Sequence, residues 1–209
     1  MEFDLSNFSE SETYSLLTQT IIPRPIAWVL SENTLASGND LKSFNLAPFS
    51  FFNGIASKPA LFMFSVGAWD VSGKTKDTLA NIRNSKKFTV GIPSYSQNET
   101  VQKTSTRLPY GTSEVDMYGV NTTEWDWPTP LITECSINFA CTYSMELNPQ
   151  SSTQIVVFAE ISKIEISDKV IGRDEKDRLT VDPILVDPLL RLGSGYYGKL
   201  GSTKKVVLE

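Results

Sequence analysis

The sequence predicts a mainly β protein, a closed or split β-barrel with a few short flanking helices. Five segments have the apolar runs or the apolar–polar alternation of strands, and turn residues separate them. Only short stretches have helical spacing, which argues against a doubly wound α/β sheet. No repeat, low-complexity stretch or linker interrupts the 209 residues, so we expect a single domain over residues 1–209.

Each expected element has a local signal. Residues 26–30 read IAWVL, residues 60–66 form a continuous apolar run, and residues 155–166 alternate after Ala159. The expected elements, in chain order, are a helix at 14–20 capped by Ser11, strands at 26–30 and 60–66, a helix at 78–85, and strands at 88–92, 131–147 and 155–166. We also expect turns at 37–40 and 172–178, and short helices over the core between 95 and 127.

Composition and charge exclude several partners. The net charge is −5 with a pI near 4.9, which argues against nucleic acid, since that affinity comes mainly from clustered Lys and Arg. The first residues, MEFDLSNFSESE, lack the basic start and apolar run of a signal peptide, and no apolar run reaches the ~20 residues of a membrane span. We therefore expect a cytoplasmic protein with no membrane partner.

The chain has no histidine and only two cysteines. The missing histidine rules out a Ser-His triad and most zinc sites, and we expect no metal. Cys135 and Cys141 match neither a CxxC pair nor a zinc pattern. On one strand they would lie about 20 Å apart at ~3.3 Å per residue, too far for a disulfide. We interpret both as small buried hydrophobic residues.

The segment 45–53, NLAPFSFFN, suits neither a core strand nor a solvated loop. Proline gives up a hydrogen bond of the strand ladder, and three phenylalanines have no reason to lie in water. We expect a kinked, largely buried segment whose backbone and small polar groups face a flat aromatic cofactor.

A second candidate site follows the strand at 60–66. Residues 67–75 read GAWDVSGKT, one residue too long between the glycines for a P-loop. Lys76, Asp77 and Thr78 then begin a helix, whose N-terminus favours an anion. The alternative is an Asp77 N-cap beside a solvated lysine. Arg24, between Pro23 and Pro25, is either a surface charge or a phosphate ligand.

Together these blocks resemble the flavin reductase-like family, FMN-binding split-barrel proteins that include flavoredoxin. The resemblance rests on PRPIAWV at 23–29, NLAPFSFFN at 45–53, KDTLANI at 76–82 and RLGSGYY at 191–197, and it covers residues 23–197. It implies a Greek-key-like FMN-binding split barrel and a homodimer with FMN near the subunit interface.

Position by position, the resemblance implies a cofactor site. The flavin ring would be lined by Asn45, Ala47, Pro48, Phe49 and Ser50. The ribityl chain and phosphate would be held by Arg24, Ser50, Lys76 and Thr78, with Asp77 shaping the turn. Arg191 and Tyr196 would close the pocket, and Trp28 would pack either beside the ring or in the core.

The resemblance implies an FMN-dependent oxidoreductase that takes hydride from NADH or NADPH at flavin N5. No catalytic side chain is expected, because the flavin carries the chemistry. Two alternatives stay open: an FMN-binding electron carrier without its own nicotinamide site, and a flavin-free dimeric binding module. The absence of GxGxxG does not separate the first two.

Overall fold

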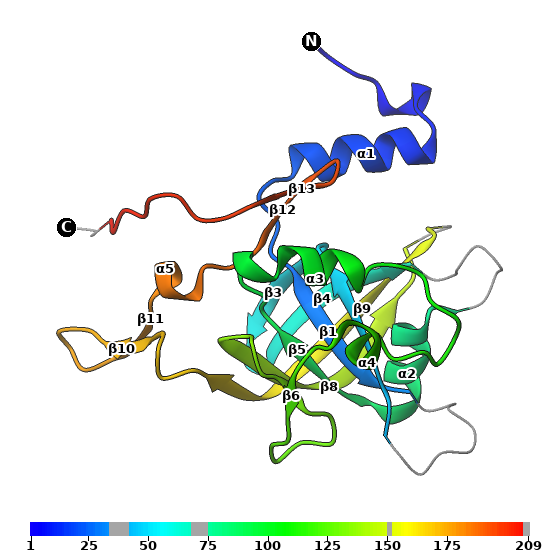
Figure 1. Ribbon diagram of the computed structural model, residues 1–209. Coiled ribbons are helices and arrows are strands. Elements are labelled where there is room, and N and C mark those ends of the chain that lie inside the picture. Colours follow the sequence, from blue (N-terminus) through cyan, green and yellow to red (C-terminus); the bar gives the residue numbers. More distant parts are fainter. Residues whose placement is uncertain (34–41, 68–74, 150–151, 207–209) are drawn as a thin grey trace.

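The computed structural model describes residues 1–33, 42–67, 75–149 and 152–206 (Figure 1). Its main element is a curled seven-stranded sheet of antiparallel pairs, in the order β2-β1-β5-β8-β9-β4-β3. Its strands are β1 (Ala27–Glu32), β2 (Phe44–Phe49), β3 (Phe52–Ser57), β4 (Ala60–Gly67), β5 (Lys87–Gly91), β8 (Ile137–Leu147) and β9 (Gln154–Ile166). This half-open barrel confirms the predicted fold class. The expected turn at 37–40 and most of the segment 67–75 lie outside the described residues.

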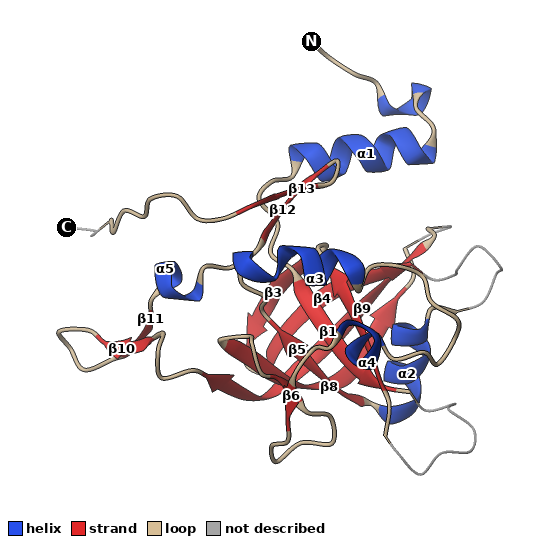
Figure 2. Ribbon diagram, viewed as in Figure 1, coloured by secondary structure: helices blue, strands red, loops and turns tan. Residues whose placement is uncertain are grey.

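Short helices and hairpins surround the sheet (Figure 2). The helices are α1 (Glu10–Thr20), α2 (Asp77–Ser85), α3 (Asn98–Lys103), α4 (Glu114–Tyr118) and α5 (Pro183–Val186), with 3-10 turns η1 (Leu5–Asn7) and η2 (Tyr95–Gln97). The two-stranded pairs are β6 (Thr122–Thr123) with β7 (Leu131–Ile132), β10 (Ile171–Arg173) with β11 (Leu179–Val181), and β12 (Leu190–Gly193) with β13 (Tyr196–Gly198). No helix among these described segments is long and apolar enough to cross a membrane.

Strand β1 separates two hydrophobic clusters, because alternate residues of a strand point to opposite faces. Ala27 and Val29 join the cluster inside the barrel, where Leu79 and Ile82 of α2 also pack. Trp28 and Leu30 join the outer cluster beneath α3 and α4. Trp28 is fully buried and does not line the pocket described below, so its core interpretation is confirmed.

Helix α1 lies beside the β12–β13 hairpin, outside the barrel (Figure 1). It begins at a capping box formed by Ser9 and Glu12, so the expected Ser11 cap is wrong. Gly193 keeps the hairpin close to the helix. It has φ +86°, and a Cβ there would lie 2.5 Å from the Thr18 carbonyl oxygen.

The expected strand at 131–147 is broken in the structure. The side chain of Asn138 accepts from the Ile132 backbone N–H at 3.0 Å and donates to the carbonyls of Ile132 and Cys135. These bonds hold a turn between β7 and β8. Cys135 therefore lies outside the strand that carries Cys141, and both thiols are buried, as expected.

The segment 45–53 also differs from its expectation. Pro48 lies within β2, opposite Trp28 of β1, so part of this segment forms a regular strand, although not the core strand that its composition excludes. β2 is an edge strand, where the missing N–H breaks no ladder. Asn45 and Leu46 are buried, whereas the residues from Ala47 to Phe52 are half-buried and Asn53 is exposed.

Candidate functional site

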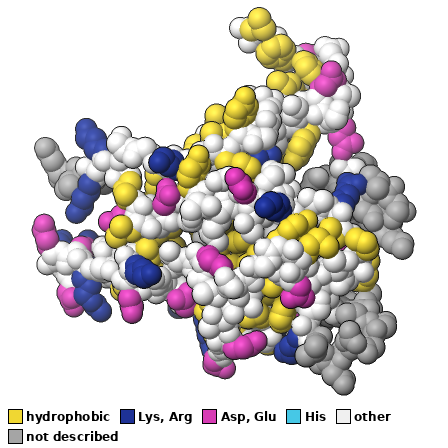
Figure 3. Space-filling view, viewed as in Figure 1, with side chains coloured by type: hydrophobic (Ala, Val, Ile, Leu, Met, Phe, Trp, Pro, Cys, Tyr) yellow, Lys and Arg dark blue, Asp and Glu magenta, His cyan; other side chains and the backbone are white. Residues whose placement is uncertain are grey.

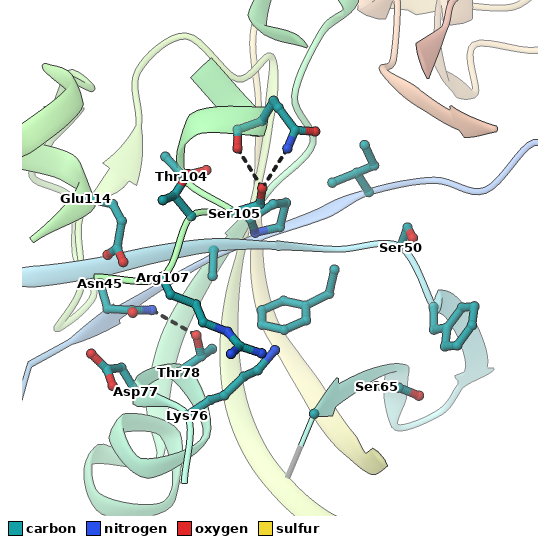
Figure 4. A pocket seen from close by; sticks show the side chains of 18 of the residues that line it. Asn45, Ser50, Ser65, Lys76, Asp77, Thr78, Thr104, Ser105, Arg107 and Glu114 are labelled. Carbon is teal, nitrogen blue, oxygen red and sulfur yellow. Dashed lines mark hydrogen bonds between the residues drawn. The ribbon is translucent and has the colours of Figure 1, made fainter. Parts of the chain in front are cut away.

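A pocket of about 380 Å³ opens beside β2. Its walls come from β2 and the turn after it, the first turn of α2, the segment 104–108, Tyr14 of α1, and the β12–β13 hairpin. Figure 4 shows polar side chains from several of these segments pointing toward one another. Its size and mixed lining suit a small-molecule ligand.

Nine of the eleven expected site residues line this pocket. They are Asn45, Ala47, Pro48, Phe49, Ser50, Lys76, Asp77, Thr78 and Arg191. Tyr196 is 70% exposed and lies outside it, while the next residue, Tyr197, lines the wall.

Arg24 does not line the pocket but lies behind it. Its Nη1 donates to the carbonyl oxygens of Thr18 and, at 2.6 Å, Ile21, at the end of α1. Its Nε donates to Ser50 Oγ at 3.4 Å. Burial is the main cause that lowers the pKa of Arg24. Arg24 therefore fixes α1 and supports Ser50 from behind.

Two cations, Lys76 and Arg107, extend toward the same part of the pocket (Figure 4). Burial, and then the nearby Arg107, lower the pKa of Lys76. The ion pairs between described residues include neither side chain. Gly67 leaves room for the lysine, because a Cβ there would lie 3.2 Å from both Cε and Nζ of Lys76. An anion is the ligand that would relieve this repulsion.

The start of α2 is joined to β2 by buried polar side chains. Asn45 Nδ2 donates to Thr78 Oγ1 at 2.9 Å, and both residues are buried. The N-cap of α2 is Lys76, so the alternative of an Asp77 N-cap is wrong. Asp77 Oδ2 instead accepts from the Gly111 backbone N–H at 3.1 Å, which holds the chain just before α4 against the helix.

The β12–β13 hairpin contributes to the pocket wall a hydrogen-bond donor that has no partner. Arg191 stacks on the ring of Tyr197, with its guanidinium carbon 4.5 Å from the ring centroid. Its Nη1 is the one buried side-chain nitrogen or oxygen of the described chain that has no hydrogen-bond partner. Because burying a donor without a partner is costly, this atom points to an acceptor supplied by a ligand or partner.

The segment 104–118 supplies lining residues that the sequence did not indicate. Thr104, Ser105, Arg107 and Glu114 line the pocket from this stretch. Thr104 Oγ1 accepts from Trp28 Nε1 at 2.9 Å, which anchors the segment to β1. A lone arginine and glutamate in an irregular region carry no periodic signal, so only their position in space identifies them.

Comparison with known proteins gives the family. A family model described as "Flavin reductase like domain" matches residues 19–198. The uncharacterized protein YwrF of Bacillus subtilis is 31% identical over 204 residues, covering 95% of this chain and 94% of the relative. An uncharacterized Deinococcus radiodurans protein is 39% identical over 119 residues, covering 56% of this chain and about half, 51%, of that relative.

A solved structure has a similar fold over the whole chain. Pseudomonas fluorescens 2-nitrobenzoate 2-nitroreductase NbaA has a TM-score of 0.83 and 26% identity, covering 100% of this chain and 96% of that one. The family match spans most of the chain, from the end of α1 to β13, and includes every lining residue of the pocket apart from Tyr14. The chain therefore belongs to the flavin reductase-like family.

Proposed function

We propose that this protein binds FMN in the pocket beside β2 and oxidises NADH or NADPH with it. The observation that carries the proposal is the pair Lys76 and Arg107, two cations facing one pocket with no described carboxylate in an ion pair with either. A phosphate dianion is the complement of such a pair. The family match supports a flavin as the molecule that carries it.

The pocket residues divide into a phosphate end and a ring end. Lys76 and Arg107 would hold the phosphate, with Thr78 as a neutral neighbour. The backbone and side chains of β2 from Asn45 to Phe49, and then Ser50, would meet the ring. Arg191 Nη1 would gain the acceptor that it lacks.

When bound, FMN supplies the hydride and electron chemistry. The protein's part is to position the ring, to exclude water from its buried edge, and to leave one face open to a nicotinamide. No histidine is needed for these tasks, in accord with a chain that has none. The 26% identity to a protein named as a nitroreductase supports an enzyme that passes electrons to a small acceptor.

We infer that the protein is a homodimer. Helix α1, the two residues after it and the β12–β13 hairpin carry exposed apolar residues away from the barrel, and Figure 3 shows hydrophobic side chains on this arm. They include Tyr14, Leu17, Ile21, Ile22 and Tyr196. Exposed apolar surface of this kind is typical of an interface. Light scattering should give twice the chain mass of 23.2 kDa, and a monomeric mass would refute the dimer.

Two measurements test the flavin function. First, the protein freed of ligand is titrated with FMN and with riboflavin; FMN should bind more tightly, because only FMN has the phosphate. Second, the FMN-loaded protein is mixed without oxygen with NADH and with NADPH, and at least one should bleach the flavin. Failure to bind FMN refutes the whole proposal. Binding without bleaching by either nicotinamide refutes the enzyme and favours an electron carrier.

A further inference from the structure

Glu114 is a buried carboxyl group in the pocket that the roles above leave unused. It is the first residue of α4, and only 5% of its surface is exposed. Its Oε2 accepts a hydrogen bond of 3.0 Å from the backbone N–H of Leu46. This bond joins α4 to β2 next to Asn45, and Figure 4 shows Glu114 and Asn45 on the same side of the pocket. The carboxyl group therefore lies against β2, the strand that is proposed to meet the flavin ring.

The charges around Glu114 do not stabilise its ionised form. β2 carries no titratable residue, and Asp77 in the first turn of α2 repels a second carboxylate. Lys76 and Arg107 line the same pocket, but the ion pairs of the described chain include none with Glu114. Asp116, the other carboxylate of α4, is exposed to water. Burial first, and then Asp77, raise the pKa of Glu114 to about 7, although its hydrogen bond with Leu46 acts in the opposite direction.

We propose, on the basis of the flavin site above, that flavin binding requires a proton on Glu114, whose neutral carboxyl group completes the ring end of the pocket. A neutral carboxyl group donates its O–H to a carbonyl or ring-nitrogen acceptor of the flavin, while its other oxygen still accepts from Leu46. An ionised carboxylate has acceptors only, and it would repel the flavin phosphate. No covalent bond changes: the proton comes from water as the flavin binds and returns to water as it leaves.

Riboflavin is the probe for this coupling, because it lacks the phosphate group that itself titrates near pH 6. Its dissociation constant is measured by fluorescence quenching from about pH 6.5 to about pH 8.5 in three proteins. These are the wild type, Glu114→Gln and the control Asp116→Asn. The glutamine keeps an acceptor for Leu46 but cannot ionise, and the control removes a charge from the same helix at an exposed site.

In the wild type the dissociation constant should rise on the order of tenfold between about pH 7 and about pH 8.5, because the protonated fraction falls. Glu114→Gln should show no such rise, and Asp116→Asn should follow the wild type. Calorimetry of the wild type in two buffers of different ionisation enthalpy should show uptake of close to one proton per riboflavin near pH 8. That measurement does not depend on whether a variant folds.

Two results would overturn the coupling while leaving the flavin site intact: riboflavin binding without proton uptake, or the same pH dependence in the wild type and in Glu114→Gln. A folded wild-type protein that binds neither riboflavin nor FMN at any pH would overturn the flavin site, and this proposal with it. The two failures are therefore distinguishable.

Discussion

Replacing Lys76 by methionine should weaken FMN binding without weakening the fold. Methionine is also long and unbranched, one atom shorter than lysine, and it fills most of the space beside Gly67, where the lysine Cε and Nζ lie 3.2 Å from the position of an added Cβ. The substitution removes the charge and leaves the packing volume nearly unchanged. It therefore isolates the electrostatic contribution of Lys76 to the phosphate end of the pocket.

The two effects of Lys76→Met have opposite signs. A hydrogen bond to a charged group contributes about 1.5–3 kcal/mol, so FMN affinity should fall roughly 10- to 150-fold. In the ligand-free protein, burial and Arg107 both disfavour the ammonium ion, as its lowered pKa indicates. Removing the charge should therefore leave the free energy of unfolding unchanged or raise it slightly.

Fluorescence titrations with FMN and riboflavin, together with urea unfolding of the ligand-free protein, measure both effects. Riboflavin affinity should stay within about twofold of the wild type, because riboflavin has no phosphate. Lys58→Met, at an exposed lysine outside the pocket, is the matched control and should change neither affinity. An equal loss for FMN and riboflavin, or a fold destabilised by more than ~1 kcal/mol, would refute the assignment of Lys76 to the phosphate.

Three further results are expected. Arg24→Ala should lower the free energy of unfolding, measured with urea, by ~2–3 kcal/mol, because the carbonyls of Thr18 and Ile21 lose their donor. A loss below ~1 kcal/mol would contradict the proposed role of Arg24 at the end of α1. Folding favours the protonated form of Glu114, because burial raises its pKa. The wild type should therefore lose up to ~3 kcal/mol of stability relative to Glu114→Gln as the pH rises from about 4.5 through about 7. A stability difference that stays constant with pH would show that Glu114 ionises freely. Cys135 and Cys141 should react with a thiol reagent only after unfolding, because both are buried and burial raises the pKa of each thiol. Labelling of the native protein within minutes would contradict this burial.

The barrel could be predicted from the sequence because several of its strands have a recognisable hydrophobic pattern within their own segment. The apolar run of β4 and the alternation of β9 are signals within a single segment, and both strands occur where they were expected. The break before β8 could not be predicted in this way. It depends on the side-chain amide of Asn138, which hydrogen-bonds to backbone groups of the preceding turn. Nothing in the alternating pattern of 131–147 distinguishes this asparagine from a surface residue.

Pro48 shows the limit of a local rule. The rule that proline disrupts a ladder holds for a central strand, and the sequence does not reveal which strands form an edge. Position in the sheet follows from the pairing order, which places β2 last beside β1. The polar side chains of this segment, Asn45 and Ser50, nevertheless line the pocket.

The residues missed by the sequence share one property: they reach the site across long stretches of chain. Glu114 bonds to Leu46, 68 residues away, and Arg107 meets Lys76 from a segment with no regular structure before α4. The blocks that were recognised, at 45–53 and 76–82, instead carry short runs of unusual composition. Compact motifs in the sequence thus indicate one part of the candidate site, whereas tertiary packing builds the other part and leaves no local signal.

The features that cost the ligand-free protein stability converge on this one pocket. Lys76 lies beside another cation, Glu114 is buried near Asp77, and Arg191 Nη1 has no partner in the described chain. Elsewhere, buried polar groups such as Asn138 and Thr89 are hydrogen-bonded. A fold selected for stability alone would pair or replace these three groups, since each opposes burial. One ligand with an anionic end and a ring edge of acceptors would satisfy all three together, and for this reason the pocket is better explained by a bound flavin than by packing alone.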